Sequence, residues 1–148
     1  MKQSSRQKAL SAFQRLRVFQ EANGEYVRCI SCNKIIHVSE ADGGHFENRR
    51  NRVTELLPEN VHAQCRNCNR FHEGNVIAYR AGIAHKYGVP YLERLENIIL
   101  ASKGNIEAFD KLESKDKLIV AKRKTNQEYE ELAKYYRAEL RRIKREIN

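Results

Sequence analysis

Two Cys-x-x-Cys pairs constrain the fold of this chain more than any other feature. Cys29 and Cys32 form the first pair, Cys65 and Cys68 form the second, and 32 residues separate the two pairs. Two thiolates at positions i and i+3 reach one metal ion from a tight turn, and two such turns complete a tetrahedral four-sulfur shell. We therefore predict a structural zinc ion, because a closed shell leaves no position for water or substrate.

These pairs account for all four cysteines of the chain. No apolar stretch approaches the ~20 residues of a membrane span, and the opening residues Met1 to Ser5 lack the apolar segment of a secretion signal. We therefore expect a cytoplasmic protein. In such reducing surroundings, paired cysteines bind metal more often than they form disulfides.

The charge balance points to a polyanionic partner. The chain has a formal net charge of +9, a pI of about 9.5 and a mean hydropathy of −0.76. Nucleic acid is the first expectation for such a protein, and an anionic membrane surface is the second. The alternative is a soluble protein that is merely basic.

The length of 148 residues makes one domain the default, and the residue pattern predicts a mainly helical α+β fold. Apolar residues recur at helical spacing in four segments, with Asn75 expected to cap the second and Thr125 the fourth. The stretch 104–124 is compatible with a short strand or with a helix. The predicted helices are 4–22, 76–87, 90–102 and 126–146, and the predicted strands are 26–30 and 35–38. The single domain 1–148 then consists of a zinc-stapled core, 26–87, between the N-terminal helix and a C-terminal helical region, 90–148.

Side chains suited to phosphodiester hydrolysis occur between the cysteine pairs and just after them. His45 suits the general base that activates water, because an unperturbed histidine has a pKa near ~6.5. Asp42 and Asn69 offer ligands for Mg2+ or Mn2+, which would stabilise charge on the phosphorus and the leaving oxygen. Together with Asn60, they predict an HNH-type nuclease with a ββα-metal core. The alternative is a zinc-binding interaction module without chemistry.

The motifs resemble, in order and at nearly the same spacing, the NinG (Rap) recombination endonucleases of lambda-type phages. The resemblance covers most of the chain from about residue 6 onward. It is carried by Cys29-Ile-Ser-Cys32, Asp42-Gly-Gly-His45-Phe46, Asn60-Val-His62-Ala-Gln-Cys65, Cys68-Asn69-Arg70, Gly74-Asn75 and Tyr79-Arg80.

The resemblance implies a metal-dependent endonuclease that cuts branched DNA such as Holliday junctions and D-loops. On that basis His45 is the general base, and Asn60 fixes and orients the loop that carries it. Asn69 and Asp42 are the ligands of the catalytic cation. In the common HNH pattern an acid directly precedes the histidine, where this chain has Gly44. Asp42 lies on the same side of an extended strand as position 44 and can substitute for that acid.

A phage-encoded enzyme of this kind would act in the cytoplasm of a bacterial host on a DNA partner. Arginines are expected to hold the DNA backbone, a contact that carries little sequence information and suits recognition of branch shape. These arginines are Arg49, Arg50, Arg52, Arg66, Arg70 and Arg80. His62, His72 and Glu73 are further polar candidates near the catalytic metal.

Two other functions remain open at this stage. One is an HNH nicking or restriction-type nuclease that acts on duplex DNA, and the other is a non-catalytic recombination accessory protein that binds DNA. Symmetric cuts across a four-way junction would be easiest for a homodimer. The C-terminal helix could form the dimer contact, or it could pack on the helix before it.

Overall fold

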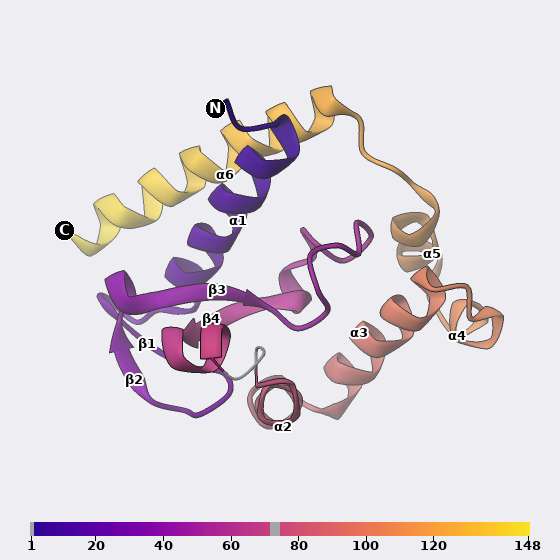
Figure 1. Cartoon of the computed structure of the whole chain (residues 1–148), viewed down its shortest axis with the longest axis horizontal. Helices are drawn as coiled ribbons and strands as arrows, with labels where there is room; N and C mark the ends of the chain where they lie inside the picture. The colour runs from indigo at the N-terminus through magenta and orange to yellow at the C-terminus, as the bar shows by residue number, and fades with distance from the viewer. Residues whose placement is uncertain (1, 72–74) are drawn as a thin grey trace.

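The computed structural model describes residues 2–71 and 75–148. Two small antiparallel sheets lie between a pair of long helices and a group of shorter helices (Figure 1). The helices are α1 (Ser5–Glu21), α2 (Val76–Tyr87), α3 (Val89–Ser102), α4 (Ile106–Asp110), α5 (Ser114–Ala121) and α6 (Asn126–Ile147). The strands are β1 (Tyr26–Arg28), β2 (Ile35–His37), β3 (Ala41–His45) and β4 (Val61–Cys65). Shorter turns are η1 (Val38–Glu40), η2 (Pro58–Asn60) and the π-helical η3 (Asn67–Phe71).

Each sheet is a hairpin that positions one cysteine pair. Strands β1 and β2 flank Cys29 and Cys32, with Arg28 opposite Ile35 in the register. Strands β3 and β4 are joined by a long connection, and Cys65 closes β4 opposite the first residue of β3. Because the backbone N–H of Ile30 donates to the carbonyl of Ala63 at 2.9 Å, the first pair is held against β4.

Helices α1 and α6 run in the same direction along one side of the sheets (Figure 1). Ser4 caps α1 and Thr125 caps α6, each through a side-chain oxygen that accepts a backbone N–H of the first turn. Phe13 packs against Tyr136 with their ring centroids 4.9 Å apart. The apolar face of α6 is therefore covered by α1, whereas the sequence had pointed to a dimer contact or to the preceding helix.

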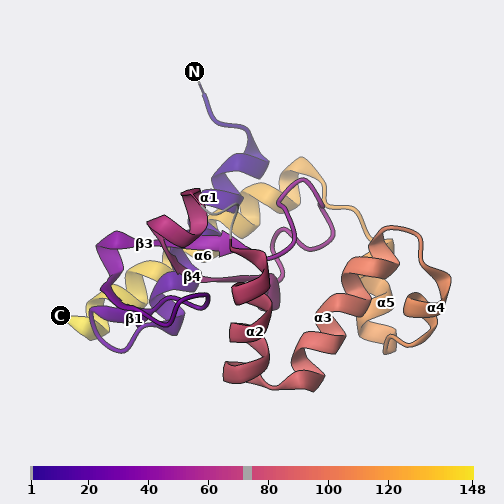
Figure 2. The ribbon, with the colours of Figure 1, turned by 60° about the horizontal axis from the view of Figure 1, so that its bottom comes forward.

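A hydrophobic core cluster, separate from the apolar contact between α1 and α6, lies between α2 and α3. These helices form a hairpin, and α4 and α5 pack beside the end of α3 (Figure 2). Buried Leu92, Leu95, Ile98 and Ile99 supply the apolar face of α3, as their helical spacing predicts. The ambiguous stretch 104–124 contains the two short helices α4 and α5 and no strand, and Leu118, Ile119 and Val120 lie within α5.

The segment that contains Asp42 and His45 is the strand β3, and its glycines lie where other parts of the chain approach the backbone closely. A Cβ atom on Gly43 would lie 2.3 Å from the backbone carbonyl oxygen of Gln14, so α1 packs directly against the main chain of β3. The glycine is therefore required for close approach of a helix and a strand, and not for a left-handed backbone. No helix in the described ranges is both long and apolar enough to cross a bilayer.

Candidate functional site

The four cysteine sulfurs form one cluster. Their Sγ atoms all lie within 4.8 Å of one another, and Cys32 and Cys65 are 3.8 Å apart. A tetrahedron with zinc–sulfur bonds of ~2.3 Å has sulfur–sulfur edges of ~3.8 Å, so the cluster has the dimensions of a four-sulfur zinc site. The predicted pairing of the two Cys-x-x-Cys motifs is confirmed, and the four cysteines can hold one zinc ion.

Nearby polar groups support this cluster. The side-chain amide of Asn75 donates to Cys68 Sγ at 3.4 Å, and the backbone N–H of Cys68 points to Cys65 Sγ at the same distance. Asn75 was predicted to cap α2, but it has a left-handed backbone with φ of 49° and makes no side-chain cap. Burial raises the pKa of the Cys29 and Cys68 thiols, which a bound dication would reverse by stabilising the thiolates.

Asp42 and Asn69, the predicted ligands of the catalytic cation, are in direct contact. The Asn69 side-chain amide donates to Asp42 Oδ2 at 2.9 Å. Arg70 donates to both carboxylate oxygens of Asp42, at 2.9 and 3.0 Å. Strand β3 and the turn η3 thus bring the predicted ligands together, and a cationic side chain occupies the same carboxylate.

The surroundings of Gly44 leave little space for a side chain at the position where the common HNH pattern has an acid. A Cβ atom at position 44 would lie 1.8 Å from Gln64 Oε1 and 3.0 Å from Asn69 Oδ1. An acidic side chain therefore has no room at position 44 unless Gln64 moves. Asp42 is two residues earlier on the same face of β3, next to Asn69, as the alternation of the strand predicts.

His45 ends β3 and lies half-buried at the start of the loop 46–57. Its Nε2 atom is 2.8 Å from the carbonyl oxygen of Glu55. A carbonyl only accepts, so Nε2 carries the proton, and in the neutral ring the lone pair is on Nδ1. Burial lowers the pKa of His45; the Glu55 hydrogen bond opposes this shift, and the positive charges of Arg49 and Arg6 reinforce it. The ring is therefore neutral near pH 7 and can accept a proton through Nδ1.

Asn60 connects both ends of this loop. It is fully buried, its Oδ1 accepts the Glu47 N–H at 2.7 Å, and its amide donates to the carbonyls of Glu47 and Thr54 at 3.0 Å. These bonds fix the residue two positions after His45 and the residue just before Glu55. The geometry is that expected for an asparagine that holds the loop around the histidine.

The predicted base and the predicted metal ligands lie on opposite faces of β3. Asp42 and Gly44 face Asn69, whereas Gly43 and His45 lie on the side of α1. The two groups are adjacent along the chain, because Gly44 and His45 are consecutive residues.

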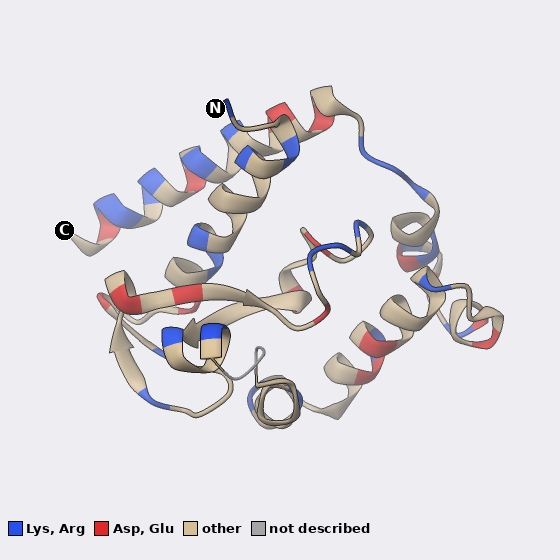
Figure 3. Cartoon of the chain, in the orientation of Figure 1, with Lys and Arg blue, Asp and Glu red and all other residues tan. Residues whose placement is uncertain are grey.

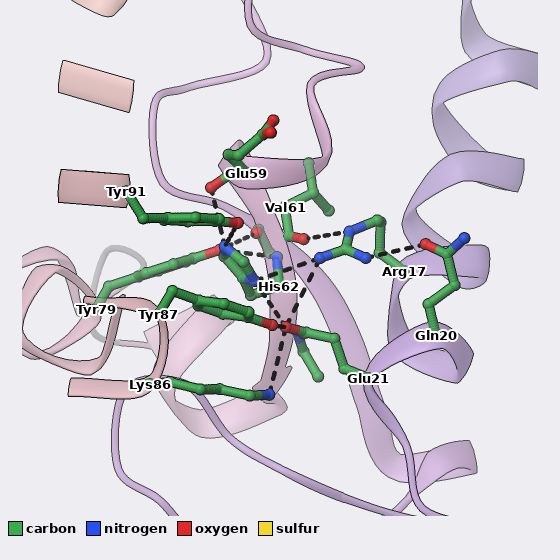
Figure 4. A network of polar contacts seen from close by, with 12 residues as sticks. Arg17, Gln20, Glu21, Glu59, Val61, His62, Tyr79, Lys86, Tyr87 and Tyr91 are labelled. Atoms are coloured by element: carbon green, nitrogen blue, oxygen red, sulfur yellow. Dashed lines mark hydrogen bonds and ion pairs between the residues drawn. The ribbon is translucent and has the colours of Figure 1, made fainter. Parts of the chain in front are cut away.

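The network of buried polar contacts around His62 was not predicted from the sequence. Around His62, the Nδ1 atom lies 2.7 Å from Glu21 Oε2 and Nε2 lies 2.9 Å from the Glu59 carbonyl oxygen (Figure 4). Tyr87 also donates to Glu21. The network ties β4 to α1 and α2, which accounts for His62 as a structural residue. An acid far along the chain from its partner leaves no local signal in a single sequence.

Several of the predicted DNA-contacting arginines have partners within the protein. Arg80 pairs with Glu96 at 2.9 Å, Arg70 pairs with Asp42, and Arg66 donates to the Ser39 carbonyl at 2.8 Å. Three others are exposed on the loop after β3, which is marked blue in Figure 3. They are Arg49, Arg50 and Arg52. The predictions for His72 and Glu73 lie outside the described residues.

The fold and the cysteine cluster define a small α+β protein with a candidate four-sulfur zinc centre. The family model described as "Bacteriophage Lambda NinG protein" matches residues 2–118, and the chain belongs to this NinG family.

Curated relatives agree with this assignment. The chain is 29% identical over 75 residues to "Protein ninG" of Salmonella phage P22 and to "Protein ninG" of Escherichia phage lambda. Each alignment covers 47% of this chain and 34% of the relative, so the chain spans about a third of the length of the relatives it matches. No solved structure matches the chain.

Proposed function

We propose that the chain is a metal-dependent DNA endonuclease that cuts branched recombination intermediates such as Holliday junctions and D-loops. The observation that carries this proposal is the geometry of His45. A neutral imidazole is held through Nε2 by a backbone carbonyl, so that Nδ1 is the basic atom. A zinc-stapled binding module has no requirement for such an arrangement.

The chemistry follows from this tautomer. Nδ1 of His45 takes a proton from water as the water oxygen attacks phosphorus, and the bond from phosphorus to the 3′ oxygen breaks. The leaving 3′ oxygen takes a proton from solvent, which leaves 5′-phosphate and 3′-hydroxyl ends. Asn60 acts as a positioning residue, because it fixes the loop whose carbonyl orients the ring.

The donor groups for a catalytic cation fit in type. A carboxylate and a side-chain amide are hard oxygen ligands, and Asp42 and Asn69 are already in contact. When bound, Mg2+ or Mn2+ would stabilise the negative charge that develops on the phosphoryl and leaving oxygens. The cation would have to compete with Arg70, whose side chain is 54% exposed.

The DNA backbone is assigned to the arginines of the loop that begins after His45. Arg49 and Arg6 line a cavity of about 310 Å³. Both guanidinium groups act electrostatically on His45, and the Glu55 carboxylate that pairs with Arg6 acts in the opposite direction. An anionic phosphate would be attracted to this side of the ring. Backbone contacts of this kind favour recognition of branch shape over sequence.

One observation favours the non-catalytic alternative. Both carboxylate oxygens of Asp42 accept hydrogen bonds from Arg70, an arrangement that a DNA-binding accessory protein could keep permanently. The two functions make different predictions for cleavage.

A cleavage assay with labelled four-way junction, D-loop and linear duplex tests the proposal. The zinc-loaded protein would be incubated with each DNA in Mg2+, in Mn2+ or in EDTA. Metal-dependent cutting of the branched substrates is the expected result. Tight junction binding without cutting in either metal would support the accessory protein, and equal cutting of linear duplex would support a general HNH nuclease.

A further inference from the structure

Glu55 is a buried carboxylate that the mechanism above does not use. Its side chain is fully buried, and an isolated charge in that position would be strongly destabilising. Arg6 of α1 donates to Oε2 at 2.7 Å, and the hydroxyl of Tyr129 in α6 donates to Oε1. Glu55 is therefore held between the two long helices.

The main chain of the same residue holds the predicted base. The carbonyl oxygen of Glu55 accepts the Nε2 proton of His45 at 2.8 Å. Glu55 thus connects two parts of the structure. Its carboxylate binds α1 and α6, and its backbone carbonyl binds the imidazole ring of His45. Rotation of the Glu55 peptide would release the ring and allow the other tautomer, in which Nδ1 is protonated and cannot act as a base.

We propose that Glu55 and Tyr129 are positioning residues that keep His45 in the tautomer with its proton on Nε2 and its basic lone pair on Nδ1. The catalytic part of this inference rests on the proposed function, whereas the part that concerns the tautomer does not. Asn60 fixes the loop at Thr54, and the Tyr129–Glu55 hydrogen bond fixes it one residue further on. Tyr129 is only 3% exposed, and burial together with the Glu55 bond raises its pKa to about 12, so the hydroxyl stays a donor.

Tyr129 belongs to the part of the chain that follows the family match. It lies beyond residues 2–118, which the family model matches. Arg6 makes a second contact to the same loop, since its guanidinium also donates to the carbonyl of Arg49 at 2.6 Å. The first turn of α1 and the first turn of α6 thus hold the loop from one side, and Asn60 holds it from the other.

The test compares Tyr129→Phe with Tyr136→Phe in the full-length, zinc-loaded chain. Both residues are buried tyrosines of α6. Among the residues that the structure describes, the Tyr136 hydroxyl has no hydrogen-bond partner. Each variant therefore loses one hydroxyl and keeps its ring in the α1–α6 contact, but only Tyr129→Phe loses the bond to Glu55.

Two readouts are needed. The ring nitrogen shifts of His45, measured by NMR, report the tautomer without reference to activity. We expect the Nε2-protonated form in the wild type and in Tyr136→Phe, and a mixture of tautomers in Tyr129→Phe. In the cleavage of a four-way junction, we expect Tyr129→Phe to lower kcat by about 10-fold at unchanged KM, because the base is misplaced while the DNA contacts remain.

The outcomes separate this inference from the proposed function. A wild-type tautomer in Tyr129→Phe would overturn the inference, whatever the enzyme does. A mixed tautomer in a protein that cuts no DNA would support the positioning role and reject the endonuclease. If Tyr129→Phe does not fold, Glu55→Gln preserves the side-chain volume, weakens both bonds and is read out in the same way.

Discussion

The carboxylate of Asp42 is bound by the guanidinium of Arg70, with hydrogen bonds of 2.9 and 3.0 Å. The side chain predicted to bind a catalytic cation is thus paired with a cationic residue that was predicted to bind DNA. If a metal replaces Arg70 at Asp42, the guanidinium becomes available to a phosphate. The site would then acquire its metal and lose an internal ion pair in the same step.

This competition predicts that Arg70→Gln binds Mn2+ more tightly than the wild type. An exposed ion pair contributes little free energy, so we expect a gain in affinity of roughly 2- to 5-fold. Electron paramagnetic resonance of free Mn2+ measures the affinity. The control is Arg80→Gln, which removes an exposed arginine that is paired with Glu96. Unchanged or weaker Mn2+ binding in Arg70→Gln would argue against Asp42 as a ligand.

The cysteine cluster predicts one zinc ion per chain, bound as part of folding. Cys65→Ser should lose zinc and unfold at a much lower temperature, because the metal-binding energy of such sites is also folding energy. Metal analysis and thermal unfolding measure the two effects, with Lys34→Ala, at an exposed residue just after the first cysteine pair, as a control. Zinc affinity should weaken as the pH falls, because burial raises the pKa of Cys29 and Cys68 and protons compete for the sulfurs. A zinc-free chain of wild-type stability would contradict the prediction.

The zinc cluster and most helices could be predicted because their signals are local. Cys-x-x-Cys spacing fixes ligand geometry, and the bounds of α2 and α3 follow from Gly88, Pro90 and the apolar periodicity. The contacts that hold His45 could not be predicted. Glu55 and Tyr129 are 74 residues apart, and a single sequence shows no pattern that pairs them.

Close packing of α1 against β3 predicts different costs for two neighbouring glycines. Gly43→Ala places a methyl group against the rigid backbone of Gln14, whereas Gly44→Ala meets the movable end of the Gln64 side chain. We expect losses in the free energy of unfolding of about 3 kcal/mol and about 1 kcal/mol, respectively. Urea unfolding measures both. Equal losses, or a larger loss for Gly44→Ala, would contradict the observed approach of α1.

The network around His62 predicts a stability that depends on Glu21 at low pH. Burial by itself would raise the pKa of Glu21, but hydrogen bonds from His62, Tyr87 and Ala63 lower it from 4.5 to about 2. The unfolded chain therefore binds more protons between these values, so this stabilisation is complete above pH 4.5 and is lost as the pH falls towards 2. The whole effect is on the order of 3 kcal/mol.

Unfolding measured from pH 7 to pH 3 checks this contribution. The wild type should lose more stability over that range than Glu21→Gln, which has no carboxylate to titrate. Glu107→Gln, at an exposed acid of α4, should follow the wild type. Parallel curves for the wild type and Glu21→Gln would show that the network does not lower the pKa of this carboxyl.

The arrangement of the loop around His45 could be predicted only in part. Asn60 was singled out through the family resemblance, and its side chain bonds to both ends of the loop. The position of Gly44 was identified as a departure, but its cause, the buried amide of Gln64, is a contact between strands. Contacts of that kind depend on the register of β3 and β4, which a 15-residue connection leaves undetermined in the sequence.

Comparison of the wild type with His45→Ala in the cleavage of a four-way junction tests the central claim most directly. Both proteins would be zinc-loaded, verified as folded and assayed under single-turnover conditions in Mn2+, with His37→Ala as a control at a partly exposed histidine of β2. We predict that His45→Ala lowers the cleavage rate by about 10²- to 10⁴-fold, as expected for loss of a general base, and that His37→Ala cuts like the wild type. Equal cleavage by the wild type and His45→Ala would contradict the account.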